Sequence, residues 1–366
     1  MNEKMMRTLG IIIACFAAFI IILFFVSSCM NGTYTYERLE ERMLEIAQNY
    51  YTNNEDELPV SDKDSKTMTL RDMISDGNLD EVTELFDDES AKCDGNVTVT
   101  NNNGYYLYSP YLSCSTDDDE YQTTYLKDKI IEDSLVESGV GLYEENGQYI
   151  MKGEVTNNFV SYNDKLFRII RINEDGTIRL LEMSGLSQKK WDDRYNPDTK
   201  FNSGINEYEI NDIDSRLKEA TVNYYNDTTV WPDETKGFIT TQSLCIGKRS
   251  QADITKDGST ECSQTMSDQT FGSLAVYEYL QASLDPNCDT TISTACRNYN
   301  WMSNFQFSTW MITADAESSQ YVYVLYQKPQ INTASGLASI NVVFNLSDKA
   351  IYVSGTGTET DPYIFR

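Results

Sequence analysis

The chain contains no histidine and no Cys-x-x-Cys spacing. Without histidine it lacks the commonest general base, the commonest metal ligand and any Ser–His or Cys–His nucleophile pair. Without paired cysteines at short spacing it also lacks the usual ligand set of a structural zinc site. We therefore expect a non-enzymatic protein with no cofactor and no metal, with an enzyme that works through carboxylates as a distant third hypothesis.

Positive charge is also scarce. The 366 residues include 29 lysines and arginines against 57 aspartates and glutamates, a net charge of −28. So negative a field keeps a protein soluble and argues against nucleic acid or an anionic membrane surface as a partner. Cationic ligands and calcium stay open. Residues 117–120 are acidic, but no EF-hand spacing or glycine follows, so a solvated acidic loop is the favoured interpretation.

Only one long apolar run exists. Residues 9–26 (LGIIIACFAAFIIILFFV) carry no charge and are long enough to cross most of a bilayer core as a helix. Lys4 and Arg7 precede this run, which favours the cytoplasmic side for the N-terminus. We expect residues 1–29 to anchor the chain in a cell membrane as a single pass, with the C-terminal part extracellular. The alternative is a lipoprotein signal ending in Ser27-Ser28-Cys29, with Cys29 as the lipidated residue.

Six cysteines follow residue 29, and an even number in an exported region predicts disulfides. Six cysteines allow 15 connectivities, so pairing between sequence neighbours is a prediction from spacing alone. Each bridge would add roughly 2–4 kcal/mol to stability. The predicted pairs are Cys93 with Cys114, Cys245 with Cys262, and Cys288 with Cys296.

An amphipathic helix is predicted within residues 30–58. Tyr36, Leu39, Met43, Ile46 and Tyr50 follow one another at steps of three and four and form one apolar stripe. Pro59 ends the pattern. Two interpretations stay open, a helix that packs on its own domain or serves as a stalk, and a helix that mediates self-assembly through residues 34–57.

Residues 59–126 are predicted to form a small α+β unit. Two short helices, at 69–74 and 79–86, precede alternating runs at 97–100 and 105–108. The Asn/Gly cluster at 101–104 predicts a hairpin between these runs, and the predicted Cys93–Cys114 bridge would join its open end. A linker helix is expected at 127–138.

This N-terminal part resembles the type IV pilin and pseudopilin-like surface proteins of Gram-positive bacteria. The resemblance depends on the apolar span, the helix ending in NYYTNNEDELP, the segment TLRDMISDGNLDEV and the cysteine-flanked hairpin. It implies a subunit whose apolar helix anchors it and then packs in a filament core. One departure is that Gly10 is followed by three isoleucines, with no glutamate five residues in, so the family's prepilin cleavage motif is missing.

Residues 139–366 are predicted to form one larger α+β domain. Strands are expected at 159–162, 166–172 and 177–181, with a hairpin loop at 173–176. Helices are expected at 214–225 and 271–280, separated by a long loop region. Later strands are expected at 309–312, 321–325, 340–346 and 351–353.

Four blocks of this region are similar to a recurrent domain of Gram-positive surface proteins with the C-type lectin-like fold, which the formylglycine-generating (sulfatase-modifying) proteins also use. The blocks are NNFVSYNDKLFRIIRINEDGTIRLL, FGSLAVYEYL, NYNWMSNFQFSTWMIT and GTGTETDPYIF. The resemblance implies function in loops displayed on a rigid scaffold. The Gly-x-Arg-Pro usual before the late strand is replaced by Ala338-Ser-Ile-Asn341.

Aromatic and amide side chains in these loops are the candidate ligand-binding residues, because aromatic faces beside amides suit sugar or peptide recognition. The alternative interpretation is that the tryptophans fill the core. The candidates are Trp231, Asn300, Trp301, Asn304, Phe305, Trp310, Tyr321 and Tyr323.

Together these features predict a membrane-anchored extracellular protein, a pilin-like structural subunit that displays a lectin-like adhesion domain. The alternative is a monomeric anchored receptor, or a lipoprotein, that binds a glycan or protein ligand.

Overall fold

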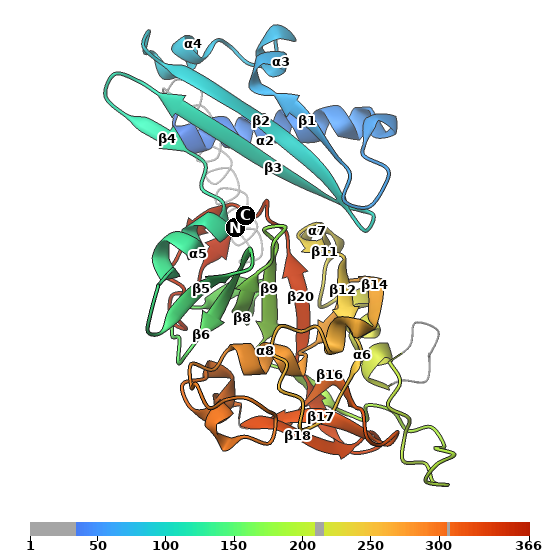
Figure 1. Ribbon diagram of the computed structural model, residues 1–366. Helices are drawn as coiled ribbons and strands as arrows, with labels where there is room; N and C mark the ends of the chain where they lie inside the picture. The colour runs from blue at the N-terminus through green and yellow to red at the C-terminus, as the bar shows by residue number, and fades with distance from the viewer. Residues whose placement is uncertain (1–33, 209–215, 306–307) are drawn as a thin grey trace, which may run out of the picture. The chain divides into compact units, whose positions relative to one another are not determined.

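The computed structural model describes residues 34–208, 216–305 and 308–366, and the described chain is a mixed α+β protein (Figure 1). The predicted span at 9–26 and Cys29 lie outside the described residues. None of the described helices combines the length and the apolar character that a membrane crossing requires. The chain divides into two compact units. Unit 1 contains residues up to 54, 67–97 and 110–123, and unit 2 contains 55–66, 98–109 and 124–366.

Unit 1 is organised around helix α2 (Tyr36–Asn53). Thr35 caps its first turn by accepting a hydrogen bond from the backbone N–H of Arg38. The apolar stripe predicted from the sequence is buried at Leu39, Met43 and Ile46, and it ends at Tyr51 rather than at the exposed Tyr50. The apolar stripe of the helix therefore packs within its own unit, which is part of the first of the two interpretations of this helix.

The sheet beside this helix has the strand order β1-β2-β3-β4. Its central hairpin turns at Asn103 and Gly104, which both have positive φ, as a two-residue turn between twisted strands requires. The first disulfide, Cys93–Cys114, joins the two hairpin strands as predicted. The bounds are β1 (Ser65–Thr69), α3 (Leu70–Ser75), α4 (Val82–Phe86), β2 (Lys92–Asn102), β3 (Tyr105–Ser115) and β4 (Glu120–Gln122).

Gly95 in β2 lets helix α2 approach the sheet closely. A Cβ atom at this position would lie 3.1 Å from Cε of Met43 and 2.8 Å from the backbone oxygen of Tyr111. At the other end of the helix, the ring of Tyr36 stacks on that of Tyr121 with centroids 4.8 Å apart. The interior of unit 1 is therefore a layer of apolar and aromatic contacts between one helix and one sheet.

Unit 2 contains an eight-stranded sheet with the order β11-β20-β9-β8-β6-β5, in which β15 also pairs with β20 and β7 with β8. The predicted strands at 159–162, 166–172 and 177–181 form its antiparallel centre, and the predicted 173–176 loop is confirmed by a turn with Gly176 at φ +81°. The bounds are β5 (Gly141–Glu145), β6 (Gln148–Lys152), β7 (Phe159–Tyr162), β8 (Lys165–Ile172), β9 (Ile178–Glu182), β11 (Ile239–Thr240), β15 (Gly272–Ser273) and β20 (Val342–Leu346).

A second sheet has the order β10-β19-β16-β17-β18, with β13 paired to β16. Two short ribbons, β12-β14 and β21-β22, complete the strands of the described chain. The bounds are β10 (Leu186–Lys189), β12 (Gln242–Cys245), β13 (Lys248–Arg249), β14 (Thr265–Gln269), β16 (Thr309–Asp315), β17 (Tyr321–Tyr326), β18 (Lys328–Thr333), β19 (Ala338–Ile340), β21 (Tyr352–Ser354) and β22 (Ile364–Phe365).

Helices in unit 2 are short and lie between the strands (Figure 1). The predicted helix at 214–225 is present as α6. The predicted helix at 271–280 is shorter than expected, because Gly272 and Ser273 pair with β20 as a strand and the helix begins only at Val276. The helical elements are α5 (Leu126–Ser134), α6 (Arg216–Asn226), α7 (Asp233–Lys236), α8 (Val276–Gln281), η1 (Glu55–Glu57), η2 (Glu261–Ser263), η3 (Thr294–Arg297) and η4 (Trp301–Asn304).

Helix α5 is an integral part of unit 2 and not the separate linker that we expected at 127–138. Leu126 and Ile130 are fully buried in the core, and the N–H of Leu126 donates to the carbonyl oxygen of Ala350 at 2.8 Å. The boundary between the units therefore lies near residue 124, since burying these side chains gains more than leaving the helix exposed.

The core of unit 2 is rich in aromatic rings. Trp231 lies against Tyr162, Phe271 and Phe344, with ring centroids 5.1–5.9 Å apart.

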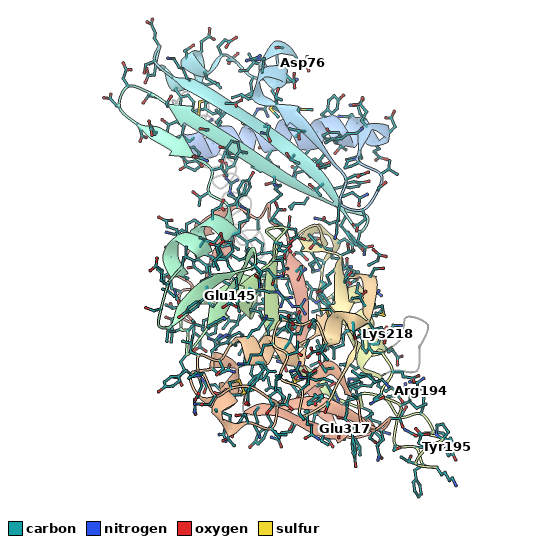
Figure 2. All side chains as sticks on the ribbon, viewed as in Figure 1. Asp76, Glu145, Arg194, Tyr195, Lys218 and Glu317 are labelled. Carbon is teal, nitrogen blue, oxygen red and sulfur yellow. A yellow bond between two sulfur atoms is a disulfide. The ribbon has the colours of Figure 1, made fainter. Side chains whose placement is uncertain are left out.

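Acidic side chains such as the labelled Asp76 in unit 1 and Glu145 in unit 2 lie on the exposed surface of their own units (Figure 2).

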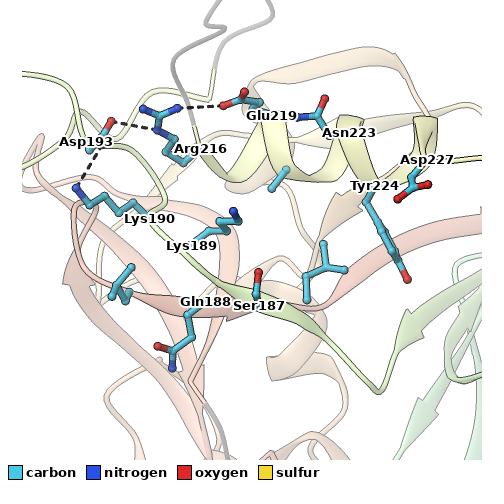
Figure 3. Close-up of a pocket in the computed structure, with 13 residues that line it drawn as sticks. Ser187, Gln188, Lys189, Lys190, Asp193, Arg216, Glu219, Asn223, Tyr224 and Asp227 are labelled. Atoms are coloured by element: carbon cyan, nitrogen blue, oxygen red, sulfur yellow. Dashed lines mark hydrogen bonds and ion pairs between the residues drawn. The ribbon is translucent and has the colours of Figure 1, made fainter. Parts of the chain in front are cut away.

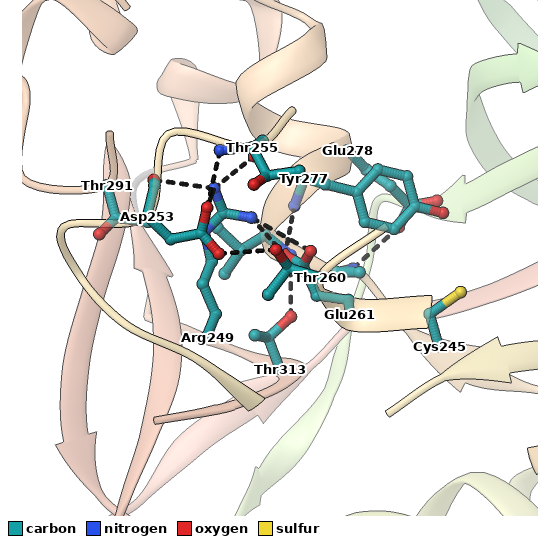
Figure 4. Close-up of polar contacts among 12 residues, drawn as sticks. Cys245, Arg249, Asp253, Thr255, Thr260, Glu261, Tyr277, Glu278, Thr291 and Thr313 are labelled. Atoms are coloured by element: carbon teal, nitrogen blue, oxygen red, sulfur yellow. Dashed lines mark hydrogen bonds and ion pairs between the residues drawn. The ribbon is translucent and has the colours of Figure 1, made fainter. Parts of the chain in front are cut away.

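Buried ion pairs brace the long loop region that connects the two sheets (Figure 4). Arg249 and Glu261 are both fully buried, and Nη1 of Arg249 donates to both carboxylate oxygens of Glu261 at 3.1 Å. Oε1 of Glu261 also accepts a hydrogen bond from the backbone N–H of Tyr277 at 3.0 Å. Cys245–Cys262 closes this region and Cys288–Cys296 closes the next loop. All three predicted disulfide pairings are confirmed.

Candidate functional site

Five of the eight residues predicted to bind a ligand are buried. Trp231, Trp310 and Tyr323 are fully inaccessible, and Asn300 and Trp301 are 0% and 1% exposed. The side chain of Asn300 instead donates to the carbonyl oxygens of Tyr279 and Cys296 at 3.0 Å. The tryptophans therefore fill the core, which was the alternative interpretation of the sequence.

The other three predicted residues are at least partly accessible. Asn304 is exposed, whereas Phe305 and Tyr321 are half-buried. Asn304 lines a hollow together with Arg168, far from it in sequence, and Phe305 packs against the core. The structure does not gather the eight predicted residues into one site.

A different site forms between helix α6 and strand β10, and we name it the α6–β10 groove (Figure 3). Its volume is about 630 Å³. Charged and amide side chains dominate, with a few apolar ones. It is lined by Leu186, Ser187, Gln188, Lys189, Lys190, Asp193, Arg216, Glu219, Ala220, Asn223, Tyr224, Asp227 and Leu337.

Ion pairs hold most of the charges at one end of the groove. Asp193 lies 3.4 Å from Arg216 and 3.3 Å from Lys190, and Arg216 also pairs with Glu219 at 3.3 Å (Figure 3). The ammonium group of Lys189, by contrast, has no ion-pair partner among the described residues. It is therefore the cation that a ligand could engage without first breaking an internal pair.

Tyr224 forms part of the opposite wall. Its hydroxyl donates to Oε1 of Glu182, a buried carboxylate, at 2.9 Å. Burial raises the pKa of Tyr224 strongly, and the adjacent negative charge of Glu182 raises it further. The phenol therefore stays protonated at neutral pH and acts as a fixed hydrogen-bond donor inside the wall, not as an acid–base group.

Two of the predicted aromatic residues lie directly behind the groove. The indole N–H of Trp310 donates to the carbonyl oxygen of Lys189 at 2.7 Å, which fixes the backbone of β10. Trp231 packs edge-on against Tyr224 with ring centroids 5.9 Å apart. These tryptophans therefore position groove residues instead of touching a ligand themselves.

The chemistry of the groove suits the binding of a polar ligand. Its lining contains both charge signs, an amide pair and hydroxyls, but neither cysteine nor histidine. Within the described ranges no three metal-ligating side chains gather to hold an ion. Such a lining can hydrogen-bond a polar ligand at several points while Leu186 and Leu337 contribute apolar contact.

Sequence reasoning missed every residue of this groove. The local signal is the segment LSQKKWDD at 186–193, where two adjacent lysines precede two aspartates in an otherwise acidic chain. Its partner, Arg216, lies 26 residues after Lys190, and no local pattern connects the two. Comparison of the chain with family models, with curated proteins and with solved structures found no match.

Proposed function

We propose that this protein is a membrane-anchored extracellular surface protein whose unit 2 binds a glycan or protein ligand in the α6–β10 groove. The groove carries the binding part of the proposal, because it offers a lysine with no ion-pair partner among the described residues, together with amides and a serine hydroxyl, in one open concavity. Extracellular placement is supported by three disulfides, which persist in oxidising compartments. The anchor is the uncharged run at 9–26.

Unit 1 is proposed to be the structural part, in keeping with its resemblance to pilin-like subunits. A single capped helix lying on a four-stranded sheet supports that resemblance. Because the apolar stripe of α2 is buried within the unit, self-assembly through residues 34–57 would have to use the polar face of the helix. We likewise propose that unit 2 has a lectin-like fold, and its two larger sheets and its two disulfide-closed loops support this proposal.

The binding part is tested by probing the full-length protein on an array of neutral and charged glycans and on immobilised extracellular-matrix proteins. Lys189→Ala should reduce capture about tenfold on any surface that wild type recognises, since one charge-assisted contact contributes roughly 1.5–3 kcal/mol. Lys66→Ala is the matched control, an exposed lysine of β1 outside the groove. Equal losses in the two variants would contradict the groove assignment.

The assembly part is tested by shearing filaments mechanically from intact cells that express a C-terminally tagged protein. Several copies per sheared particle would support a filament subunit. A tag that stays entirely in the membrane fraction would support the second candidate, a monomeric anchored receptor.

A further inference from the structure

Arg168 in strand β8 has unusual surroundings for an arginine. Its side chain contacts two aromatic rings, with Cζ 4.6 Å from the ring centre of Phe159 and 4.3 Å from that of Trp301. The residue is only 7% exposed. Cation–π contacts with two rings stabilise the charge of the guanidinium group.

Hydrogen bonds fix the direction of the guanidinium group. Nε donates to Oδ1 of Asn158 at 2.8 Å, and Nη2 donates to the carbonyl oxygen of Val155 at 2.6 Å. The third nitrogen, Nη1, has no acceptor among the described residues. Asn158 is itself held by donating to the carbonyl oxygen of Ile169 at 2.9 Å. The unused nitrogen is thus a donor in a preorganised position.

The guanidinium group of Arg168 also has no ion-pair partner among the described residues. No described carboxylate lies within 4 Å of it, and burial lowers the pKa of Arg168 to about 10, which the more distant Glu359 opposes only in part. At neutral pH the guanidinium group remains charged, and its burial costs desolvation free energy. An anion at Nη1 would offset this cost.

A hollow of about 600 Å³ opens at this arginine. Among the described residues its lining combines hydroxyls, one amide and two exposed carboxylates with two apolar side chains, Val155 and Phe159. The polar members are Glu154, Thr156, Asn304, Thr358, Glu359 and Thr360. It shares no residue with the α6–β10 groove.

From this geometry we propose that the hollow is a second binding site in unit 2, and that it takes a sugar acid, with one carboxylate at Nη1 of Arg168. Asn304 and the three threonines then hydrogen-bond the hydroxyl groups of the ring. Glu154 and Glu359 can accept hydrogen bonds from hydroxyls as well, and they disfavour ligands with two or more negative charges, such as a phosphate. The sparse apolar lining disfavours a peptide side chain.

The test measures binding of D-glucuronate to the full-length protein by isothermal titration calorimetry, with D-glucose and acetate as comparison probes. We expect glucuronate to bind at least tenfold more tightly than either, because glucose lacks the carboxylate and acetate lacks the hydroxyls. Equal affinity for glucuronate and glucose would overturn the role of Arg168. Equal affinity for glucuronate and acetate would overturn the assignment to a sugar acid.

Variants separate this site from other causes of binding. Arg168→Lys keeps a charge but loses the planar fork, so it should weaken glucuronate binding about tenfold. Glu359→Gln removes a nearby negative charge and should tighten binding roughly 3- to 10-fold, whereas Glu144→Gln, an exposed control in β5, should leave it unchanged.

A thermal melt will show whether Arg168→Lys folds. If it does not, Asn304→Ala and Glu359→Gln still test whether glucuronate binds in the hollow at Arg168. Both positions are exposed, and Asn304→Ala should weaken glucuronate binding several-fold. A loss of affinity in Glu359→Gln, or no change in either variant, would contradict the proposal.

Discussion

The two units bury different kinds of side chain. Unit 1 closes its interior with apolar and aromatic contacts between helix α2 and a hairpin, and the buried carboxylate of Glu40 accepts a hydrogen bond from Thr123. Unit 2 buries whole ion pairs, such as Arg249 with Glu261, under a long loop region. A simple helix-on-sheet layer needs only patterning, whereas a loop-rich domain must satisfy many polar groups that no regular strand pairs.

A spectroscopic difference makes the comparison measurable. All four tryptophans of the chain, at positions 191, 231, 301 and 310, belong to unit 2 and are buried there. Tryptophan fluorescence therefore reports the unfolding of unit 2 alone, while far-UV circular dichroism reports both units. Urea unfolding of the full-length protein, followed by both probes, therefore distinguishes a loss of stability in unit 2 from one in unit 1.

The largest effect is expected for Glu278→Ala in unit 2. Glu278 is fully buried and accepts hydrogen bonds from Arg171 at 2.8 Å and from the N–H of Ala275 at 2.8 Å, and Arg179 also pairs with it. Removing the carboxylate leaves Arg171 and Arg179 with neutral hydrogen-bond partners but without the anion that they share, which costs about 3–5 kcal/mol. The fluorescence midpoint should fall accordingly. A loss below about 1 kcal/mol would mean that water or rearrangement compensates the arginines.

Met43→Ala in unit 1 should have the next largest effect. Met43 is fully buried, and its Cε would be 3.1 Å from a Cβ atom at Gly95, so truncation leaves a cavity between helix and sheet. We expect a loss of about 2–5 kcal/mol in unit 1. The circular dichroism transition should shift while the fluorescence transition stays. A matching shift in fluorescence would show that the two units unfold together.

Asp253→Asn should produce a smaller effect that depends on pH. Burial alone would raise the pKa of Asp253, but hydrogen bonds from Thr255 and Thr260 and the charge of Arg249 hold it at about 2. Because the folded pKa lies below the unfolded value of 3.8, the stabilisation is present above pH 4 and is lost as the pH falls through 2.

The size of that loss follows from linkage. Wild-type unit 2 should lose about 2 kcal/mol between pH 5 and pH 2 through Asp253 alone. The gap in unfolding free energy between wild type and Asp253→Asn, followed by fluorescence, should narrow by that amount over the same range. A constant gap would contradict the assigned pKa.

The smallest effect is expected for Lys189→Ala in the α6–β10 groove. The Lys189 side chain is exposed and has no ion-pair partner among the described residues, so its removal should change the stability of unit 2 by less than about 0.5 kcal/mol. The same variant is expected to weaken ligand binding, which separates a binding role from a structural one. A fluorescence midpoint lowered by more than 1 kcal/mol would indicate a structural role.

Much of unit 1 could be predicted from its sequence, because its signals are local. Thr69 and Asp72 form the capping box of α3. The Asn/Gly cluster at 101–104, which belongs to unit 2, predicts the turn between β2 and β3 by equally local signals. The periodicity of Leu39 and Met43 predicts a buried helix face. The shift from Tyr50 to Tyr51 at the end of that face is a matter of packing that periodicity alone does not resolve.

The candidate site could not be predicted in the same way. Tryptophan is both a common ligand-contacting residue and a common core residue, and its letter in a sequence does not distinguish the two. Trp310 illustrates this, since its burial depends on strand β16 lying inside a sheet and its indole bonds to a residue 121 positions earlier. Likewise, nothing near Asn304 in the sequence indicates Arg168.

What the sequence alone determined is local: the disulfide pairings, the hairpin turns, the three central strands of the larger sheet and the apolar stripe of α2. These follow from spacing, turn chemistry and periodicity, which act over a few residues. Only the tertiary structure decided that β10 faces α6 across a groove and that Arg168 contacts Phe159 and Trp301 with one nitrogen unused. The reason is that burial and ion pairing depend on which distant segments the packed core brings together.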